Sequence, residues 1–183
     1  GDALVAKKLS RKVANVLTWQ ERRGKMKVAC LNCHGETFVD NFYKQFDSLV
    51  VLYNDKFAKP AKLIMDDLTK DGVLNAKAPF EHPVQWVYWE LWHHEGRRAR
   101  HGASMMGPDY THWHGMYEVS KHFYTKFLPQ VVELAAEKSP ALKEKYAKKV
   151  QKLLEADEHI WKRGLKPEEA QRLRKAYRKR YNE

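Results

Sequence analysis

The sequence is poor in the features that mark several classes of protein. Its 183 residues include only two cysteines, nine glycines and seven prolines, which excludes a disulfide scaffold and a low-complexity segment. No apolar run approaches the roughly 18 residues that a membrane span requires, and no charged-then-apolar leader opens the chain. No repeat recurs at a solenoid period. We therefore expect a mature or excised soluble piece, of one domain or two small ones, that buries its own core.

Positive charge is abundant and unevenly placed. The formal net charge is +11, yet the 43% apolar and 12% aromatic residues are too many for a disordered polycation. Residues 137–183 carry 15 Lys and Arg against 8 Asp and Glu, so most of the excess lies there. This pattern is typical of solvated amphipathic helices, and it also fits a docking face for an acidic partner or for haem propionates.

The spacing of apolar residues predicts an all-α fold of long amphipathic helices. No segment alternates apolar and polar residues, and no Asn-Gly or Asp-Gly turn joins two β-branched runs. We expect three regions: a basic helix with an aromatic-striped helix in residues 1–70, histidine-, tryptophan- and arginine-rich helices in residues 71–136, and basic helices in residues 137–183. The expected helices cover residues 3–28 with a break near Gly24, a striped helix that ends at Asp71-Gly72, residues 84–106, residues 110–137, residues 140–161, and a last helix from Pro167.

Several of these helices have predicted caps and kinks. Asp109 is a natural N-cap for the helix from Tyr110, and Ser139 for the helix that Pro140 begins. Pro60 is expected to kink or divide the striped helix because proline lacks a backbone donor. The stripe repeats every three or four residues, which predicts burial in a core or in an interface. Its members are Phe38, Phe42, Phe46, Leu49, Tyr53 and Phe57.

Both cysteines lie in one short motif, Cys30-Leu31-Asn32-Cys33-His34. This is the Cys-x-x-Cys-His pattern of covalent c-type haem attachment. Two thiols three positions apart reach the two vinyl groups of one porphyrin, and the histidine that follows becomes the proximal ligand of the iron. The motif therefore predicts one haem c, bound by Cys30, Cys33 and His34.

Two other sites can be built from the same residues. Two thiolates and an imidazole also supply three of the four ligands of a zinc ion, although zinc sites usually spread their ligands over two loops. A redox dithiol is the other alternative, but it requires a βαβ setting that this helical sequence lacks. If haem is attached, the chain matures outside the cytoplasm, in the periplasm or an equivalent lumen.

Histidine is concentrated in one region. Seven of the nine histidines fall between His82 and His122. One haem uses one distal imidazole, so the excess suggests that further haems lie nearby, supplied by another part of a longer protein or by another chain. Aromatic side chains suited to porphyrin faces and arginines suited to propionates accompany them. These are Trp86, Trp89, Trp92, Trp113, Tyr88, Tyr110 and Tyr117, with Arg97, Arg98 and Arg100; a packed core and a solvated face are the ordinary explanations.

Three stretches resemble the C-terminal part of octahaem hydroxylamine oxidoreductases and their hydrazine-oxidising and nitrite-reducing relatives. The first is Thr18-Trp19-Gln20-Glu21-Arg22-Arg23 leading into the haem motif. The second runs from Glu90 to Gly102 as ELWHHEGRRARHG, and the third from Met105 to Gly115 as MMGPDYTHWHG. The likeness covers residues 18–132.

The resemblance implies roles for individual residues. Cys30, Cys33 and His34 match the last haem site of such a protein. His94, His101 and His114 match residues near haems, with His94 and His114 as the preferred axial ligands of iron. Tyr110 matches the tyrosine that, in the oxidising enzymes, bonds covalently to the catalytic haem of a neighbouring subunit.

The chain departs from that family in its haem count. A full member carries eight haem motifs, whereas this sequence has one, so it is not catalytic alone. We expect a fragment or small subunit of an oxidoreductase complex, in a trimeric or higher assembly with a haem-rich catalytic chain and a redox partner protein. A stand-alone basic electron carrier is the first alternative. A nucleic-acid binder is the second, but it leaves the haem motif unexplained and no recognition motif supports it.

Overall fold

The computed structural model describes residues 17–181, and every regular element in that range is a helix. The all-α prediction is therefore confirmed for these residues. Residues 3–16 of the expected first helix lie outside the described residues. None of the described helices is both long and apolar enough to cross a membrane.

The chain divides into two compact units, one ending at Asp47 and the other beginning at Ser48. The first unit contains α2 (Trp19–Cys30) and most of α3 (Glu36–Tyr53). Thr18 caps α2 through a capping box with Glu21, because each residue's side chain bonds the other's backbone N–H. The predicted break near Gly24 is wrong: α2 runs through this glycine, whose cost of about 1 kcal/mol relative to alanine is tolerated in a capped helix.

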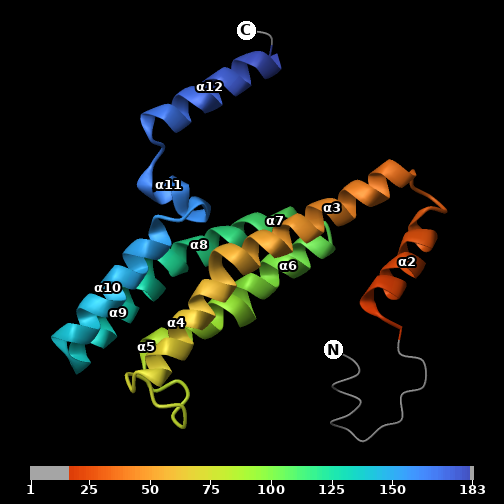
Figure 1. Ribbon diagram of the computed structural model, residues 1–183. Coiled ribbons are helices and arrows are strands. Elements are labelled where there is room, and N and C mark those ends of the chain that lie inside the picture. The colour runs from red at the N-terminus through yellow and green to blue at the C-terminus, as the bar shows by residue number, and fades with distance from the viewer. Residues whose placement is uncertain (1–16, 182–183) are drawn as a thin grey trace, which may run out of the picture. The chain divides into compact units, whose positions relative to one another are not determined.

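The second unit is a set of helices (Figure 1), and as far as Lys138 several of its α-helical segments are joined by wider π turns. Its first part is the end of α3, η1 (Asn54–Ala58) and α4 (Lys59–Lys70). The next helical stretch is α5 (Pro83–Trp89), η2 (Glu90–Glu95) and α6 (Gly96–Ser104). The third is α7 (Pro108–Thr111), η3 (His112–Tyr117), α8 (Glu118–His122), η4 (Phe123–Phe127) and α9 (Leu128–Lys138). It closes with α10 (Pro140–Leu154), η5 (Asp157–His159), α11 (Ile160–Arg163) and α12 (Pro167–Tyr181).

Several predicted helix ends are confirmed, but the helix predicted over residues 140–161 ends at Leu154, because the backbone becomes extended at Ala156. The striped helix ends at Asp71, and Gly72 adopts the left-handed conformation with a φ of 70° that favours glycine. Ser139 caps α10 by accepting a hydrogen bond from the Leu142 N–H at 3.2 Å. At Pro60 the helix is neither broken nor ended; instead the π turn η1 immediately precedes this proline.

The prediction for Asp109 is wrong. Helix α7 begins at Pro108, so its N-cap is Gly107 and Asp109 lies within the first turn. Pro108 takes the first helical position, because its fixed φ suits that position and its missing backbone donor is not needed there. Asp109 still lies where a carboxylate favours the helix dipole.

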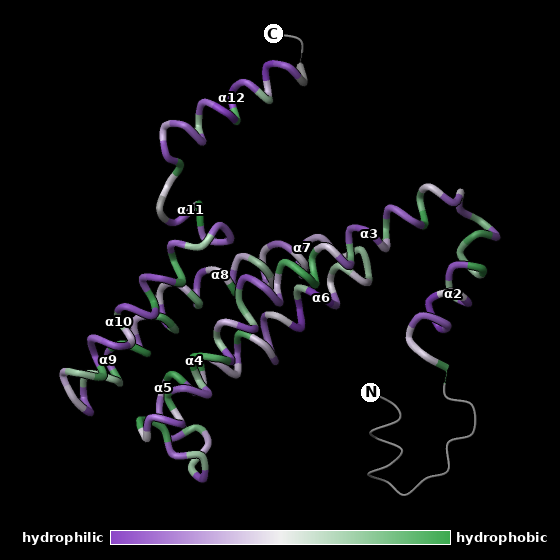
Figure 2. Tube along the Cα trace, in the orientation of Figure 1, coloured by the Kyte–Doolittle hydropathy of each residue, from purple (hydrophilic) through white to green (hydrophobic). Residues whose placement is uncertain are grey.

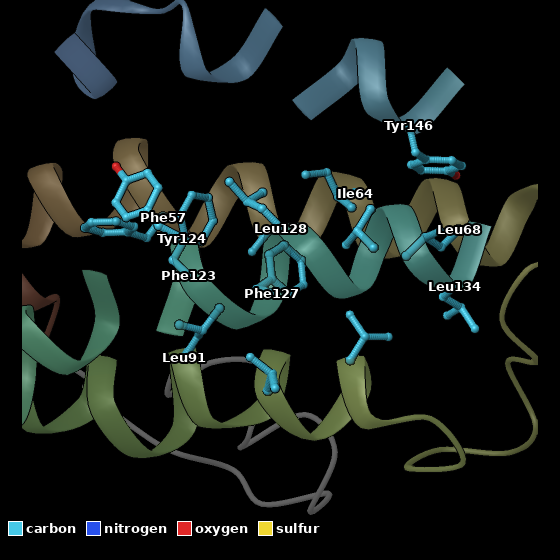
Figure 3. Close-up of a cluster of buried hydrophobic side chains, with 14 of the residues drawn as sticks. Phe57, Ile64, Leu68, Leu91, Phe123, Tyr124, Phe127, Leu128, Leu134 and Tyr146 are labelled. Atoms are coloured by element: carbon cyan, nitrogen blue, oxygen red, sulfur yellow. The ribbon is translucent and has the colours of Figure 1, made fainter. Parts of the chain in front are cut away.

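The core of the second unit consists mainly of aromatic and branched aliphatic side chains, which come from η1, α4, α5, η2, α8, η4, α9 and α10 (Figure 3). The ring of Phe57 meets that of Phe123 edge to face at 5.2 Å between centroids. Ile64, Leu68 and Phe127 are at most 2% exposed. Truncating one buried phenylalanine here costs about 3–5 kcal/mol. This core fixes the helices that carry the histidine-rich segment.

The aromatic stripe has two different environments. Tyr53 and Phe57 are 1% exposed and join the core of the second unit. Phe38, in the first unit, is 50% exposed, and Phe42 and Phe46 are half-buried. The basic C-terminal helix α12 has no buried residue among its described side chains, and the hydropathy of its trace is polar along most of its length (Figure 2). This exposure fits both a solvated face and a docking face.

Candidate functional site

The Cys-x-x-Cys-His motif occupies the last turn of α2 and the link to α3. Cys30 is the final residue of the helix, and the N–H groups of Cys33 and His34 both donate to its carbonyl, at 3.1 and 3.0 Å. The two cysteines are thus one helical turn apart, which places them on one side of the turn. Both are free thiols: Cys30 is half-buried and Cys33 is exposed.

Ion pairs and cation–π contacts join α2 to α3 around this link. Arg23 donates two hydrogen bonds to the carboxylate of Asp47, at 2.7 and 2.8 Å, and its guanidinium lies 4.7 Å from the Tyr43 ring centroid. Lys27 donates to Asp40 at 2.6 Å. The hydrogen bonds from Arg23 hold the pKa of Asp47 below its usual range. Polar contacts therefore hold the two helices in place around the motif.

Apolar side chains near the motif are left uncovered within the first unit. No residue of α2 is buried. Met26, Leu31 and Phe38 are all at least 45% exposed, and the ring of Phe38 stacks on that of His34 with centroids 4.7 Å apart. Exposed apolar surface around two accessible thiols is what a covalently attached apolar group would cover.

The histidine-rich segment lies in the second unit, on η2 and α6 and, after α7, on η3 and α8. These helices approach closely because small residues face each other. A side chain on Gly102 would lie 2.6 Å from the Thr111 nitrogen, and one on Gly115 would lie 2.6 Å from the Ala99 Cα. Only glycine fits at these two positions, and the close approach brings the predicted site residues of both helices to one region.

His94 and His114 are both exposed, and one polar chain connects them. Arg98 donates to His94 Nε2 at 2.8 Å and to Glu118 at 3.3 Å, and Glu118 Oε1 lies 3.4 Å from His114 Nδ1. A guanidinium can only donate, so His94 Nε2 is the acceptor and its lone pair is engaged by Arg98 in this structure. A carboxylate on Nδ1 is the usual outer partner of a histidine that ligates through Nε2. His114 Nε2 lies 3.6 Å from Asp109.

His101 and Tyr110 are brought together elsewhere on the same surface. Both line a hollow of about 260 Å³ with Arg97, Arg98 and residues of the turn between α6 and α7. Met106 in that turn has a φ of 54°, a left-handed conformation that is uncommon outside glycine, asparagine and aspartate. Tyr110 is 56% exposed, so its ring is accessible from outside the chain.

Of the arginines and aromatic residues near the histidines, some are open to solvent and others are engaged within the fold. Arg97 contacts His93 Nε2 at 3.0 Å. The side chain of Arg97 is exposed, as is that of His94. Arg100 is different: it donates to the Trp92 carbonyl at 3.4 Å and lies over the Tyr53 ring at 4.8 Å, so it is engaged within the fold. Half or more of the surface of several aromatic side chains is open, namely Trp86, Trp113, Tyr110 and Tyr117.

The sequence alone did not identify one further group. Glu90, Glu95 and His122 place ligand atoms within 4.8 Å of one another, and Glu95 is 2% exposed. Burial raises the pKa of Glu95, and the neighbouring His122 opposes this shift. Glu90 and Glu95 are five residues apart, which an ordinary α-helix would place on different faces, so the usual spacings gave no signal.

The chain matches no family model, no curated protein and no solved structure.

Proposed function

We propose that the chain is a monohaem c-type cytochrome, with Cys30 and Cys33 forming the two thioethers and His34 the proximal ligand. The observation that carries this proposal is the motif's arrangement: two free thiols one helical turn apart, followed by an exposed imidazole. The bound haem would supply one-electron transfer. The chain's own residues hold it, exclude water from it and tune it.

The surroundings of the motif fit such a group. Met26, Leu31 and Phe38 offer exposed apolar surface beside the thiols. Phe38 stacks on the His34 ring, which restricts how that imidazole can turn. A zinc ion would use the thiols and His34 but would leave this apolar surface in water, which favours the larger, apolar ligand.

We further propose that the chain works within a hydroxylamine-oxidoreductase-like multihaem complex. The exposed His94 and His114 would each ligate an iron through Nε2: Glu118 would orient His114 through its Nδ1, and Arg98 would have to release His94 Nε2. Tyr110 would support the catalytic haem of a neighbouring chain, and the assembly would act in redox chemistry of small nitrogen compounds. Exposed aromatic and arginine side chains on this surface support contact with a haem-rich partner, in a trimeric or higher assembly. Its compartment would be the periplasm or an equivalent lumen.

Extraction with acidified acetone tests the covalent attachment. The full chain, produced with c-type maturation, should keep its haem spectrum after denaturation and extraction, because thioethers survive this treatment. The variant Cys33→Ser should retain much less haem, while Leu31→Ala, which keeps both thiols, serves as the matched control. A colourless pellet from the unaltered chain would eliminate the proposal.

The size of the native particle distinguishes the complex from a stand-alone carrier. Co-elution with a haem-rich chain supports the complex. A lone haem-bearing particle of 21.6 kDa supports a basic electron carrier instead, for which the net charge of +11 would steer acidic partners. The rate of association of such a carrier would fall steeply with salt.

A further inference from the structure

A second group of metal-binding side chains lies within the second unit, where η2 contacts α8. Glu90 and Glu95 begin and end η2, and His122 is the last residue of α8. One ligand atom from each of the three lies within 4.8 Å of the others. The group shares no residue with the haem motif.

The π turn makes this arrangement. In an α-helix of 3.6 residues per turn, positions five apart differ in direction by about 140°. A π turn closes its hydrogen bonds five residues apart, as the bond from the Gly96 N–H to the Leu91 carbonyl shows here, so Glu90 and Glu95 come to one face. The buried hydroxyl of Tyr53 donates to the same carbonyl at 2.9 Å, which supports the wider turn. Such turns occur frequently at functional sites.

Glu95 is the most unusual member. Its side chain is 3% exposed, and Oε1 contacts His122 Nδ1. Its other oxygen, Oε2, is buried and has no hydrogen-bond partner in the structure. A buried polar atom without a partner destabilises the folded state, and more so when it is charged, so a missing ligand is a natural explanation.

We infer that Glu90, Glu95 and His122 form a binding site for a divalent first-row cation, of which Zn²⁺ is the representative. One imidazole and two carboxylates are a donor set that zinc accepts, whereas Ca²⁺ and Mg²⁺ prefer oxygen alone. Bond lengths of about 2.0–2.2 Å place tetrahedral ligand atoms about 3.4 Å apart. The observed spacing of at most 4.8 Å therefore needs only a small side-chain adjustment.

The ion would connect η2 to α8, and it would give the unpaired carboxylate oxygen of Glu95 a partner. Because it binds the folded state, it would stabilise the second unit. Three protein ligands leave a fourth position for water or a small anion. Glu90 and Glu95 flank His94 on η2, and Arg98 follows them in α6, so the ion would also brace the segment that carries these two residues.

Titration of the full chain with Zn²⁺, followed by X-ray absorption at the zinc edge, tests the site. We expect one equivalent bound through nitrogen and oxygen and a higher melting temperature of the helical circular dichroism signal. Glu95→Gln, which keeps the shape but removes the charge, should weaken this binding at least tenfold, given that even outer-shell changes cost about 10–100-fold. His112→Gln, at an exposed histidine outside the cluster, is the matched control.

Three results would overturn the inference. They are a chain that binds no stoichiometric zinc, a zinc edge showing sulfur ligands from Cys30 and Cys33 only, and undiminished nitrogen–oxygen binding in Glu95→Gln. If Glu95→Gln does not fold, Glu90→Gln replaces it, because Glu90 is only half-buried and its removal leaves the core intact. Unchanged affinity in Glu90→Gln would contradict the site equally.

Discussion

His94 and His114 lie at the two ends of one polar chain, through Arg98 and Glu118. Arg98 donates to His94 Nε2 at 2.8 Å and to Glu118 at 3.3 Å, and Glu118 lies 3.4 Å from His114. The two imidazoles come from different helices, η2 and η3, which pack closely with α6. Arg98 and Glu118 therefore link the two imidazoles, and a change at one should be felt at the other.

We predict that His94→Ala converts a low-spin haem to high-spin in the native assembly, because the iron loses its sixth ligand. The change is measured in the optical and electron paramagnetic resonance spectra. His112→Ala, on the neighbouring π turn η3, provides the control and should leave both spectra unaltered. Identical spectra for His94→Ala and the unaltered assembly would remove His94 from the ligands.

Tyr110→Phe is predicted to abolish oxidation of hydroxylamine or hydrazine by the assembly, because the phenol oxygen needed for a bond to the catalytic haem is gone. Turnover and the mass of the denatured complex check this. Tyr117→Phe is a matched control, since Tyr117 is 54% exposed against 56% for Tyr110. Undiminished turnover of Tyr110→Phe would refute the role.

Gly102→Ala should destabilise the second unit by about 1–3 kcal/mol, because the new methyl group overpacks the contact between α6 and α7. Gly107→Ala is the control: its side chain would meet only one atom, at 3.7 Å, so it adds no overpacking, and it should cost less, about 0.5–1 kcal/mol, through the poorer N-cap that alanine makes for α7. Urea unfolding measures both. Equal stabilities of the two variants would show that the helices can separate without cost.

The stability of the second unit should fall as the pH decreases through the range in which His159 titrates. Burial lowers the pKa of this histidine below its ordinary value, and its Nδ1 contacts the Tyr124 hydroxyl at 2.6 Å. The unfolded chain therefore takes up a proton before the folded chain does, and stability that is full above the unfolded pKa of about 6.5 is lost below it. The free energy of unfolding should differ less between about pH 8 and about pH 5 in His159→Gln than in the unaltered chain. An equal difference would contradict the assignment.

The sequence predicted the helical class and several helix ends because these depend on local chemistry. Gly72 ends α4 and Ser139 caps α10 through backbone preferences and short-range hydrogen bonds that neighbouring residues determine. Asp109 was predicted as a cap because aspartate is a good one, and Pro108 displaced it by being better suited to begin a helix. Such competition between neighbours is difficult to decide from a pattern.

The π turns explain what the sequence could not predict. Their hydrogen bonds depend on tertiary support, such as the Tyr53 hydroxyl on the Leu91 carbonyl, which joins residues 38 positions apart. This is why no signal in the sequence indicated the cluster at Glu95, whereas the Cys-x-x-Cys-His motif, which lies within five consecutive residues, is visible in the sequence itself. The sequence indicated only that histidines are concentrated in this region, and not that a polar chain links His94 to His114.

The intact mass of the purified, denatured chain tests the central claim most directly. Covalent attachment at Cys30 and Cys33 predicts a mass higher than that of the polypeptide by one haem, with both thiols unreactive toward an alkylating reagent. A mass equal to that of the polypeptide alone, with two alkylatable thiols, would contradict the account.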